Sequence, residues 1–177
     1  MTHATLCTAS SLITQFQWPE LAGLKVLDLA CGSGRNGLWF LNQGCEVTFI
    51  DQDLSTLVKL THDKAHQWQW NLEDGSASLL PQDTFDIVLV FNYLHRPLFP
   101  QIAASLKHGG LIVYETFTWQ QAEIGRPRNP DFLLKEHELQ SVFANWQPLH
   151  YFEGRLSDAV TGIESAKAQL IARKPLQ

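Results

Sequence analysis

The most informative residues form a glycine-rich turn between a predicted strand and a predicted helix. The apolar residues 26–30 predict a buried strand, and Gly32, Gly34 and Gly37 follow it directly. A glycine turn at the start of a helix brings bare backbone and the positive end of the helix dipole against a ligand. The spacing of the glycines also fits the dinucleotide pattern GxGxxG, which alone is weak evidence. The turn therefore predicts a ligand-binding loop.

Two acidic residues narrow the choice of ligand for this turn. Asp51 comes directly after the next predicted strand, residues 46–50, where a carboxylate can accept hydrogen bonds from both hydroxyls of a ribose. The turn and this acid together predict a cofactor that contains a nucleoside. Asp28 lies inside the carboxyl end of the first strand, where a negative charge is unfavourable beside a pyrophosphate. It suits a ligand with a sulfonium and an α-ammonium group, and S-adenosylmethionine (SAM) carries both.

The residues 28–34, Asp-Leu-Ala-Cys-Gly-Ser-Gly, resemble the first motif of class I SAM-dependent methyltransferases. Three further segments, residues 91–98, 114–117 and 125–134, resemble a bacterial group near the tellurite-resistance type methyltransferases, and the resemblance spans roughly residues 20–173. It implies SAM as cofactor and S-adenosylhomocysteine as product, with Asp51 on the ribose, Asn71 and Leu72 at the adenine, and residues 91–93 at the methionyl part. The cofactor-binding residues expected on these grounds are Asp28, Ala30, Gly32, Gly34, Arg35, Asp51, Gln52, Asn71, Leu72, Phe91 and Asn92.

Candidate catalytic groups follow the fourth and fifth predicted strands. Glu115 interrupts an apolar strand near its carboxyl end, which is a costly place for a charge without a partner. It either acts as a base or pairs with an arginine of the loop that follows. His95 can accept a proton near neutral pH, or it can bond to backbone at the start of a helix.

The acceptor side is predicted from a proline-containing loop. Arg126 and Arg128 flank Pro127 in the substrate-side loop, residues 117–135, and Tyr93 is expected to face the acceptor as well. The two arginines either recognise an anionic acceptor or fasten the loop to Glu115 or Asp131. A short insert leaves little surface to grip a macromolecule, so we expect a small-molecule acceptor.

No metal site and no disulfide are predicted. His62 and His66 lie four apart on a predicted helix, but no third ligand is evident. The sequence has an odd number of cysteines, Cys7, Cys31 and Cys45, and no two of them form a CxxC pair. Reduced thiols, and the lack of Lys or Arg before Lys25, predict a cytoplasmic protein without a secretory signal.

Composition excludes two further classes. The 177 residues contain 13 Lys and Arg against 18 Asp and Glu, a net charge of −5, with no basic block. Because affinity for nucleic acid depends on neutralised phosphates, a general DNA or RNA binder is not expected. The longest apolar run, residues 87–91, is far below the ~20 residues of a membrane-spanning helix, so no membrane span is expected either.

The elements that must position these residues form an α/β pattern. Apolar runs at residues 26–30, 46–50, 67–70, 85–91 and 111–116 alternate with predicted helices at 35–43, 54–64, 97–107 and 136–143. Residues 147–152 and 165–172 predict two strands that pair antiparallel. We expect one domain with a Rossmann-like, doubly wound, mostly parallel sheet, a C-terminal antiparallel hairpin and helices on both faces, preceded by a helical lid or extension at residues 1–20.

Two other functions stay open at this level. A nicotinamide-dependent oxidoreductase fits the literal glycine pattern, although Asp28 and the terminal hairpin disfavour it. A SAM-binding sensor without turnover fits the cofactor motifs equally well. The grouping of Glu115, His95 and the arginine loop on one side of the sheet favours an enzyme.

Overall fold

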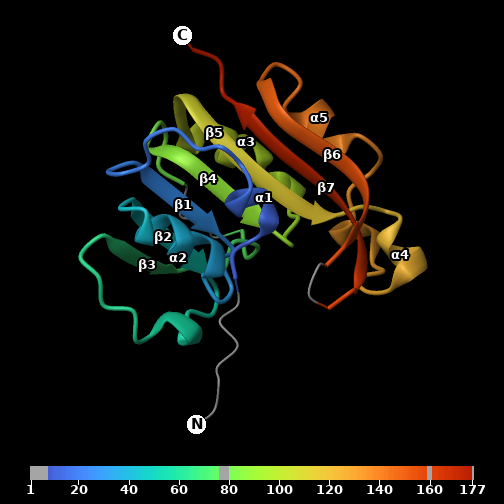
Figure 1. Ribbon diagram of the computed structural model, residues 1–177, viewed down its shortest axis with the longest axis horizontal. Helices are drawn as coiled ribbons and strands as arrows, with labels where there is room; N and C mark the ends of the chain where they lie inside the picture. The colour runs from blue at the N-terminus through green and yellow to red at the C-terminus, as the bar shows by residue number, and fades with distance from the viewer. Residues whose placement is uncertain (1–7, 76–79, 159–160, 177) are drawn as a thin grey trace.

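One mixed sheet of seven strands organises the chain, in the order β3-β2-β1-β4-β5-β7-β6 (Figure 1). The computed structural model describes residues 8–75, 80–158 and 161–176. Cys7 and the first part of the predicted N-terminal lid lie outside the described residues. The fold is that of a Rossmann-like sheet, as the alternating pattern predicts.

Five strands run parallel: β1 Lys25–Leu29, β2 Glu46–Asp51, β3 Ala65–Gln69, β4 Phe85–Phe91 and β5 Leu106–Phe117. β1 and β4 are buried along almost their whole length, which explains their nearly continuous apolar sequences. Their carboxyl ends meet at one edge of the sheet. The residues that follow these strands are therefore brought together.

The fifth strand begins earlier than predicted. Leu106 pairs with Phe85, and after an irregularity Leu111 pairs with Ile87, so Gly109 and Gly110 lie within β5 and do not end a helix. A Cβ on Gly110 would approach the carbonyl oxygen of Asp86 to 3.0 Å. This close approach of two backbones explains why a glycine occupies the irregular position.

The predicted C-terminal hairpin is confirmed. β6 Gln147–Ser157 and β7 Glu164–Arg173 pair antiparallel, and β7 also pairs antiparallel with β5. β7 is therefore an inner strand and β6 forms the edge of the sheet. This arrangement brings β7 side chains next to the carboxyl end of β5.

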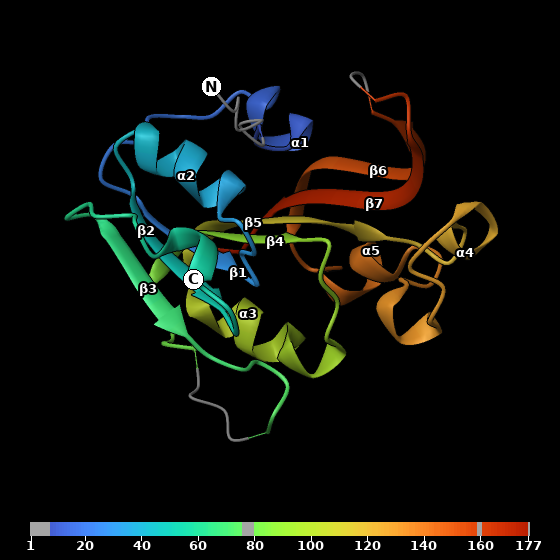
Figure 2. The ribbon, with the colours of Figure 1, turned by 90° about the horizontal axis from the view of Figure 1, so that it is seen from below.

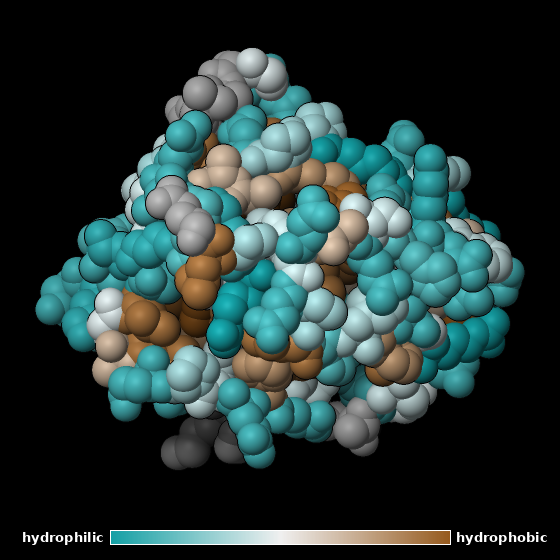
Figure 3. Space-filling model, turned by 90° about the horizontal axis from the view of Figure 1, so that it is seen from above, coloured by the Kyte–Doolittle hydropathy of each residue, from teal (hydrophilic) through white to brown (hydrophobic). Residues whose placement is uncertain are grey.

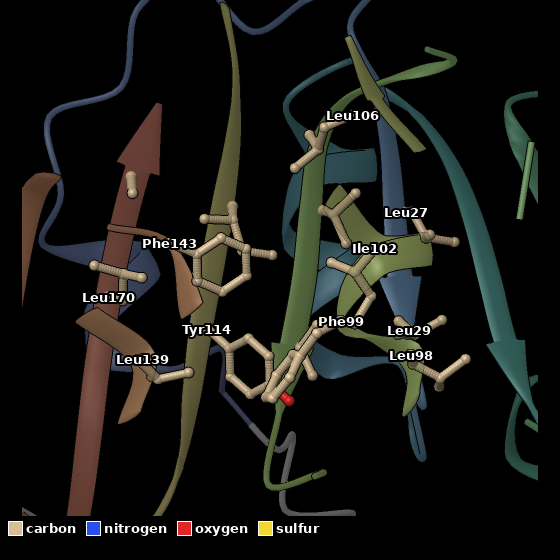
Figure 4. Close-up of a cluster of buried hydrophobic side chains, with 14 of the residues drawn as sticks. Leu27, Leu29, Leu98, Phe99, Ile102, Leu106, Tyr114, Leu139, Phe143 and Leu170 are labelled. Atoms are coloured by element: carbon tan, nitrogen blue, oxygen red, sulfur yellow. The ribbon is translucent and has the colours of Figure 1, made fainter. Parts of the chain in front are cut away.

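Helices cover both faces of the sheet (Figure 2). α1 Ser11–Thr14 and α2 Arg35–Asn42 lie on one face, and α3 Phe99–Ser105 and α5 Glu138–Val142 lie on the other. Figure 4 shows part of the core on the second face, where Phe99 packs against Tyr114 of β5 with ring centroids 6.0 Å apart and against Phe143 at 6.3 Å. Fully buried side chains of this size contribute about 1.5–3 kcal/mol each.

The predicted helix at residues 54–64 is wrong. Only a 3-10 turn, η1 Ser55–Leu57, forms there, and His66 lies in β3 instead of sharing a helix with His62. The backbone N–H of Lys64 donates to Nδ1 of His62, and the N–H of Ala65 donates to the His62 carbonyl. These local bonds hold the segment as a turn that leads into β3, in competition with a helix.

Three other helical predictions need smaller corrections. The helix predicted at 97–107 is the 3-10 turn η2 Arg96–Leu98 followed by α3, and the one at 136–143 is the shorter α5. The predicted substrate-side loop, residues 117–135, contains α4 Gln121–Ile124 and the 3-10 turn η3 Pro130–Phe132. The described part of the N-terminal lid contains only the single turn of α1.

The surface seen from above is mostly hydrophilic, and apolar residues show through it in separate patches (Figure 3). Among the described residues, no helix has the length and apolar character needed to cross a bilayer.

Candidate active site

The glycine turn connects β1 to α2 through residues with positive φ. Ala30, Gly32 and Gly34 have φ of 53°, 53° and 71°, and Gly34 caps α2 in the left-handed region. Glycine adopts this region without the steric cost that a side chain adds. Gly37 has a different role: a Cβ there would lie 2.7 Å from Oδ2 of Asp28 and 2.5 Å from Phe49. It allows the first turn of α2 to approach the sheet closely.

Asp51 holds the turn from the end of β2. Its Oδ2 accepts the backbone N–H of Gly32 at 2.8 Å, and its Oδ1 accepts the N–H of Asp53 at 3.1 Å. Each carboxylate oxygen can accept a second hydrogen bond. The residue also lines a cavity, so acceptor capacity remains for a ligand in it.

Asp28 lies beneath the turn, only 2% exposed, and its Oδ2 accepts the N–H of Gly37 at 2.8 Å. Burial raises the pKa of this carboxyl to about 7, although the Gly37 N–H and the nearby Arg35 charge oppose the rise. The Arg35 guanidinium itself donates to the carbonyl of Thr8 at 2.7 Å and so ties down the N-terminal segment.

The first cavity has a volume of about 290 Å³ and lies at the carboxyl ends of the first strands. Acidic, amide, aromatic and aliphatic side chains share its wall: Ala30, Asp51, Gln52, Trp70, Asn71, Leu72, Glu73 and Tyr93. Five of these, Ala30, Asp51, Gln52, Asn71 and Leu72, are expected cofactor residues. Acceptors for a ribose, an amide for a base edge and apolar walls for a ring fit the adenosine part of SAM.

A second cavity of about 350 Å³ adjoins the first, and the two share Glu73 and Tyr93. Its remaining wall is mostly apolar: Asn92, Leu94, Phe117, Pro127 and Phe132. Sequence reasoning missed Glu73, Leu94, Phe117, Pro127 and Phe132 as lining residues of this cavity. Phe132 is nearly half exposed, and a large apolar residue on a predicted loop is a signal that could have indicated this wall.

The turn after β4 joins the two cavities and is held from three sides. Asn92 has φ of 52°, and its backbone N–H donates to the Glu115 carbonyl at 2.8 Å. The hydroxyl of Tyr114 donates to the Tyr93 carbonyl at 3.0 Å, and Nζ of Lys167 donates to Oδ1 of Asn92 at 2.8 Å. A non-glycine residue in this region costs free energy, so these contacts are what hold it in place.

Glu115 is a member of a buried ion pair. Its side chain is 6% exposed, and Oε1 accepts Nζ of Lys167, itself 12% exposed, at 3.0 Å. Oε2 accepts Nε2 of Gln169 at 2.7 Å and the hydroxyl of Ser10 at 3.2 Å. The predicted pairing of Glu115 with an arginine of the loop is therefore wrong, because its cationic partner is Lys167 of β7.

The sequence holds only a weak signal for Lys167, a charge within the apolar run of the last strand. The antiparallel register sets it opposite Phe117, far from Glu115 in the chain. The Lys167 ammonium also lies 5.0 Å from the centroid of the Phe117 ring. Register between distant strands, not a local motif, brings these groups together.

Among the described residues, the candidate base His95 and the loop arginines Arg126 and Arg128 line neither cavity. His95 is half-buried before η2, and its carbonyl accepts the N–H of Leu98 at 3.0 Å. Arg128 donates from Nε to the Gly125 carbonyl at 3.2 Å, and the carbonyl of Arg126 accepts from Gln121 at 2.9 Å. Within the described residues, neither arginine is paired with Glu115.

Other expected cofactor residues support the cavity from behind or beside it. Phe91 is buried in the core at the end of β4, and Gly32 and Gly34 shape the turn. No group of three or more His, Cys, Asp or Glu side chains suited to a metal ion occurs among the described residues. Cys31 and Cys45 are free.

Comparisons with known proteins agree with this geometry. Residues 26–110 match the family model described as a methyltransferase domain. The chain is 29% identical, over 85% of its length, to the probable S-adenosyl-L-methionine-dependent methyltransferase TehB of Haemophilus influenzae. It spans 57% of that relative's length.

Solved structures show the same fold. The crystal structure of Haemophilus influenzae TehB matches with a TM-score of 0.67 at 25% identity, over 86% of this chain and 58% of TehB. A SAM-dependent methyltransferase from Mesorhizobium loti matches with 0.72 at 19% identity, over 93% and 96% of the two chains. The 1,6-didemethyltoxoflavin-N1-methyltransferase of Burkholderia thailandensis matches with 0.63 at 19% identity, over 87% and 72%.

The glycine turn, the acid after β2 and these matches show that the chain is similar to the class I SAM-dependent methyltransferases. SAM is the cofactor of that class. Among its members, the chain resembles TehB along most of the chain's own length.

Proposed function

We propose that this chain transfers the methyl group of SAM to a small-molecule acceptor by in-line displacement. The observation that carries the proposal is the junction of two cavities at Glu73 and Tyr93. One cavity has the side chains that a nucleoside needs, and the other is apolar and can hold a second molecule. Bound SAM supplies an electrophilic methyl carbon and a neutral thioether leaving group.

The residues of the first cavity would bind and orient the cofactor. Asp51 accepts from the ribose hydroxyls, Asn71 faces the adenine edge, and Trp70 and Leu72 form the walls. Asp28 acts from below the turn, because it fixes the N–H of Gly37 and places a carboxyl under the methionyl side. Arg35 and Phe91 complete the support at the same end of the sheet.

The second cavity would position the acceptor. A volume of about 350 Å³ holds a small molecule and no folded partner. Positioning the nucleophile in line with the methyl carbon supplies much of the rate, because an aligned pair reacts as a single unit. The Burkholderia thailandensis neighbour, whose structure contains 1,6-didemethyltoxoflavin and S-adenosylhomocysteine, is a methyltransferase of this fold that binds a small acceptor.

Three finer expectations from the sequence bear on this proposal. Glu115 and His95 are candidate bases, although the Lys167 pair gives Glu115 a structural role. An anionic acceptor, expected from Arg126 and Arg128, would require those side chains to enter the cavity that Pro127 lines. The short loop and one-domain organisation favour a cytoplasmic small-molecule enzyme over a protein or nucleic-acid methyltransferase.

Thermal shift with SAM, S-adenosylhomocysteine, NAD and NADP tests the cofactor, and formation of S-adenosylhomocysteine over a panel of small acceptors tests turnover. We expect the sulfur nucleosides to stabilise the protein and at least one acceptor to be methylated. Asp51→Ala should reduce the stabilisation, whereas Asp53→Ala, which loses bonds to Ser55, should keep it. Stabilisation by the nicotinamides alone would support an oxidoreductase, and binding without any turnover would support a sensor.

A further inference from the structure

One wall of the second cavity is apolar and partly exposed to solvent. Phe132 lines it while 49% exposed, and Leu94, Phe117 and Pro127 lie around the same space. Large apolar side chains exposed in a concave site indicate a ligand that covers them. The wall therefore favours an acceptor with an apolar ring over a small hydrated ion.

The charge of the cavity is negative. Glu73 is the single side chain lining it in the described chain that is charged at neutral pH. Lys167 touches the same wall from behind, through Asn92 and the Phe117 ring, but Glu115 neutralises it. Among the described residues that line the cavity, an anionic acceptor would thus meet a carboxylate and no cation.

The wall also offers one unused hydrogen-bonding group. The hydroxyl of Tyr93 is buried beside the Glu73 carboxylate, and it makes no hydrogen bond of good geometry among the residues that the structure describes. Burial, and then the Glu73 carboxylate, raises the pKa of Tyr93, so the hydroxyl keeps its proton. Buried hydroxyls are nearly always paired, which points to a partner supplied by a ligand.

We propose that the acceptor is an uncharged aromatic compound that carries a nucleophilic hydroxyl or amine. This inference rests on the function proposed above and names its substrate class. The ring packs on Phe132 and Phe117, and the nucleophilic group lies at the junction, between Tyr93 and Glu73.

The acceptor, SAM and Glu73 account for every bond and proton in the methyl transfer. A lone pair of the acceptor oxygen or nitrogen forms the new bond to the methyl carbon as the carbon–sulfur bond breaks. The bonding pair of that bond goes to sulfur, which gives S-adenosylhomocysteine. The acceptor proton leaves to the Glu73 carboxylate, which then returns it to solvent at the exposed mouth of the site.

Two probes with the same aromatic ring system, one neutral and one anionic, test whether the site prefers an uncharged acceptor. Binding of 2-naphthol and 2-naphthoate to the complex with S-adenosylhomocysteine is measured by calorimetry at pH 7.5. We expect 2-naphthol to bind at least about fivefold more tightly, since two unit charges about 4 Å apart in water repel by ~1 kcal/mol. Glu73→Gln should remove most of that preference and lower turnover of 2-naphthol.

A matched pair of aromatic variants tests the wall. Phe132→Ala should weaken binding of both probes by about five- to tenfold, from the loss of half a buried phenyl ring. Trp119→Ala is the control, because Trp119 is similarly exposed, at 45%, on the same segment but does not line either described cavity.

Three results would overturn the inference: 2-naphthoate binding as tightly as 2-naphthol, neither ring binding at all, or equal losses in Phe132→Ala and Trp119→Ala. Binding of S-adenosylhomocysteine alone is measured on the same samples. If it binds and the naphthol does not, the acceptor class is wrong and the proposed function stands. If S-adenosylhomocysteine itself fails to bind, the proposed function fails.

Discussion

Replacing Asp28 with asparagine removes a buried carboxyl from beneath the glycine turn and leaves an oxygen that can still accept the Gly37 N–H. In the folded protein, burial raises the pKa of Asp28 from the ordinary 3.8 to about 7. Between these two pH values the unfolded chain has lost the proton and the folded protein still holds it. The folded state then binds more protons, so stability falls as the pH rises from about 4 to about 7.

The size of this effect follows from the same values. A rise in pKa from 3.8 to about 7 corresponds to a penalty of up to about 4 kcal/mol, complete above pH 7 where both states are ionised. Asp28→Asn lacks this penalty. Its stability relative to the wild type should therefore increase by up to about 4 kcal/mol between pH 4 and pH 8, whatever constant change in packing the amide brings.

Urea denaturation of both proteins at several pH values measures the difference directly. Bound SAM should reduce it, because a cationic ligand above the turn favours the charged carboxyl, and SAM affinity of the wild type should rise through pH 7. Parallel stability curves for the two proteins would refute the reasoning, since they would show that Asp28 is ionised in the folded state throughout.

Four further predictions concern other parts of the site. Lys167→Met should cost about 3–5 kcal/mol in urea denaturation, because it leaves Glu115 buried without its cation, whereas Lys107→Met breaks a more exposed pair and should cost at most about 1 kcal/mol. Asp51→Ala should weaken SAM binding by about 1–3 kcal/mol in calorimetry, and unchanged affinity in a folded variant would contradict the cofactor site. Gly34→Val should abolish S-adenosylhomocysteine binding with the fold retained by circular dichroism, because φ of 71° and a Cβ 2.9 Å from a neighbouring leucine methyl strain the turn. Arg126→Ala should leave acceptor kinetics unchanged, and a loss of about 1.5–3 kcal/mol in kcat/KM for an oxyanion would instead support the anionic acceptor.

The sheet and the cofactor side follow from local sequence. The apolar runs that become β1 and β4 are buried on both faces, so their composition alone predicts them. Asp51 and Asn71 directly follow predicted strands, and parallel strands place their carboxyl ends at one edge. These residues are positioned by secondary structure only, which is why a sequence pattern finds them.

The errors arise where distant contacts or local bonds decide the structure. Residues 54–64 have enough apolar residues for a helix, but bonds to His62 hold a turn. The extension of β5 back to Leu106 depends on pairing with Phe85, which no period in residues 106–110 signals. Likewise the partner of Glu115 is set by the register of β7, so local spacing pointed to the nearer arginines instead.

The two cavities differ in how much of their lining lies within the residues that match the methyltransferase family model. Every residue that lines the first cavity lies within residues 26–110, the part that matches the methyltransferase family model. Phe117, Pro127 and Phe132 of the second cavity lie beyond it, and Lys167, which holds Asn92 at the junction, comes from the C-terminal hairpin. The proposed cofactor site therefore lies in the shared part of the fold. In the proposed function, selectivity for the acceptor would depend on the loop after β5 and on the strand pairing that brings β7 beside it.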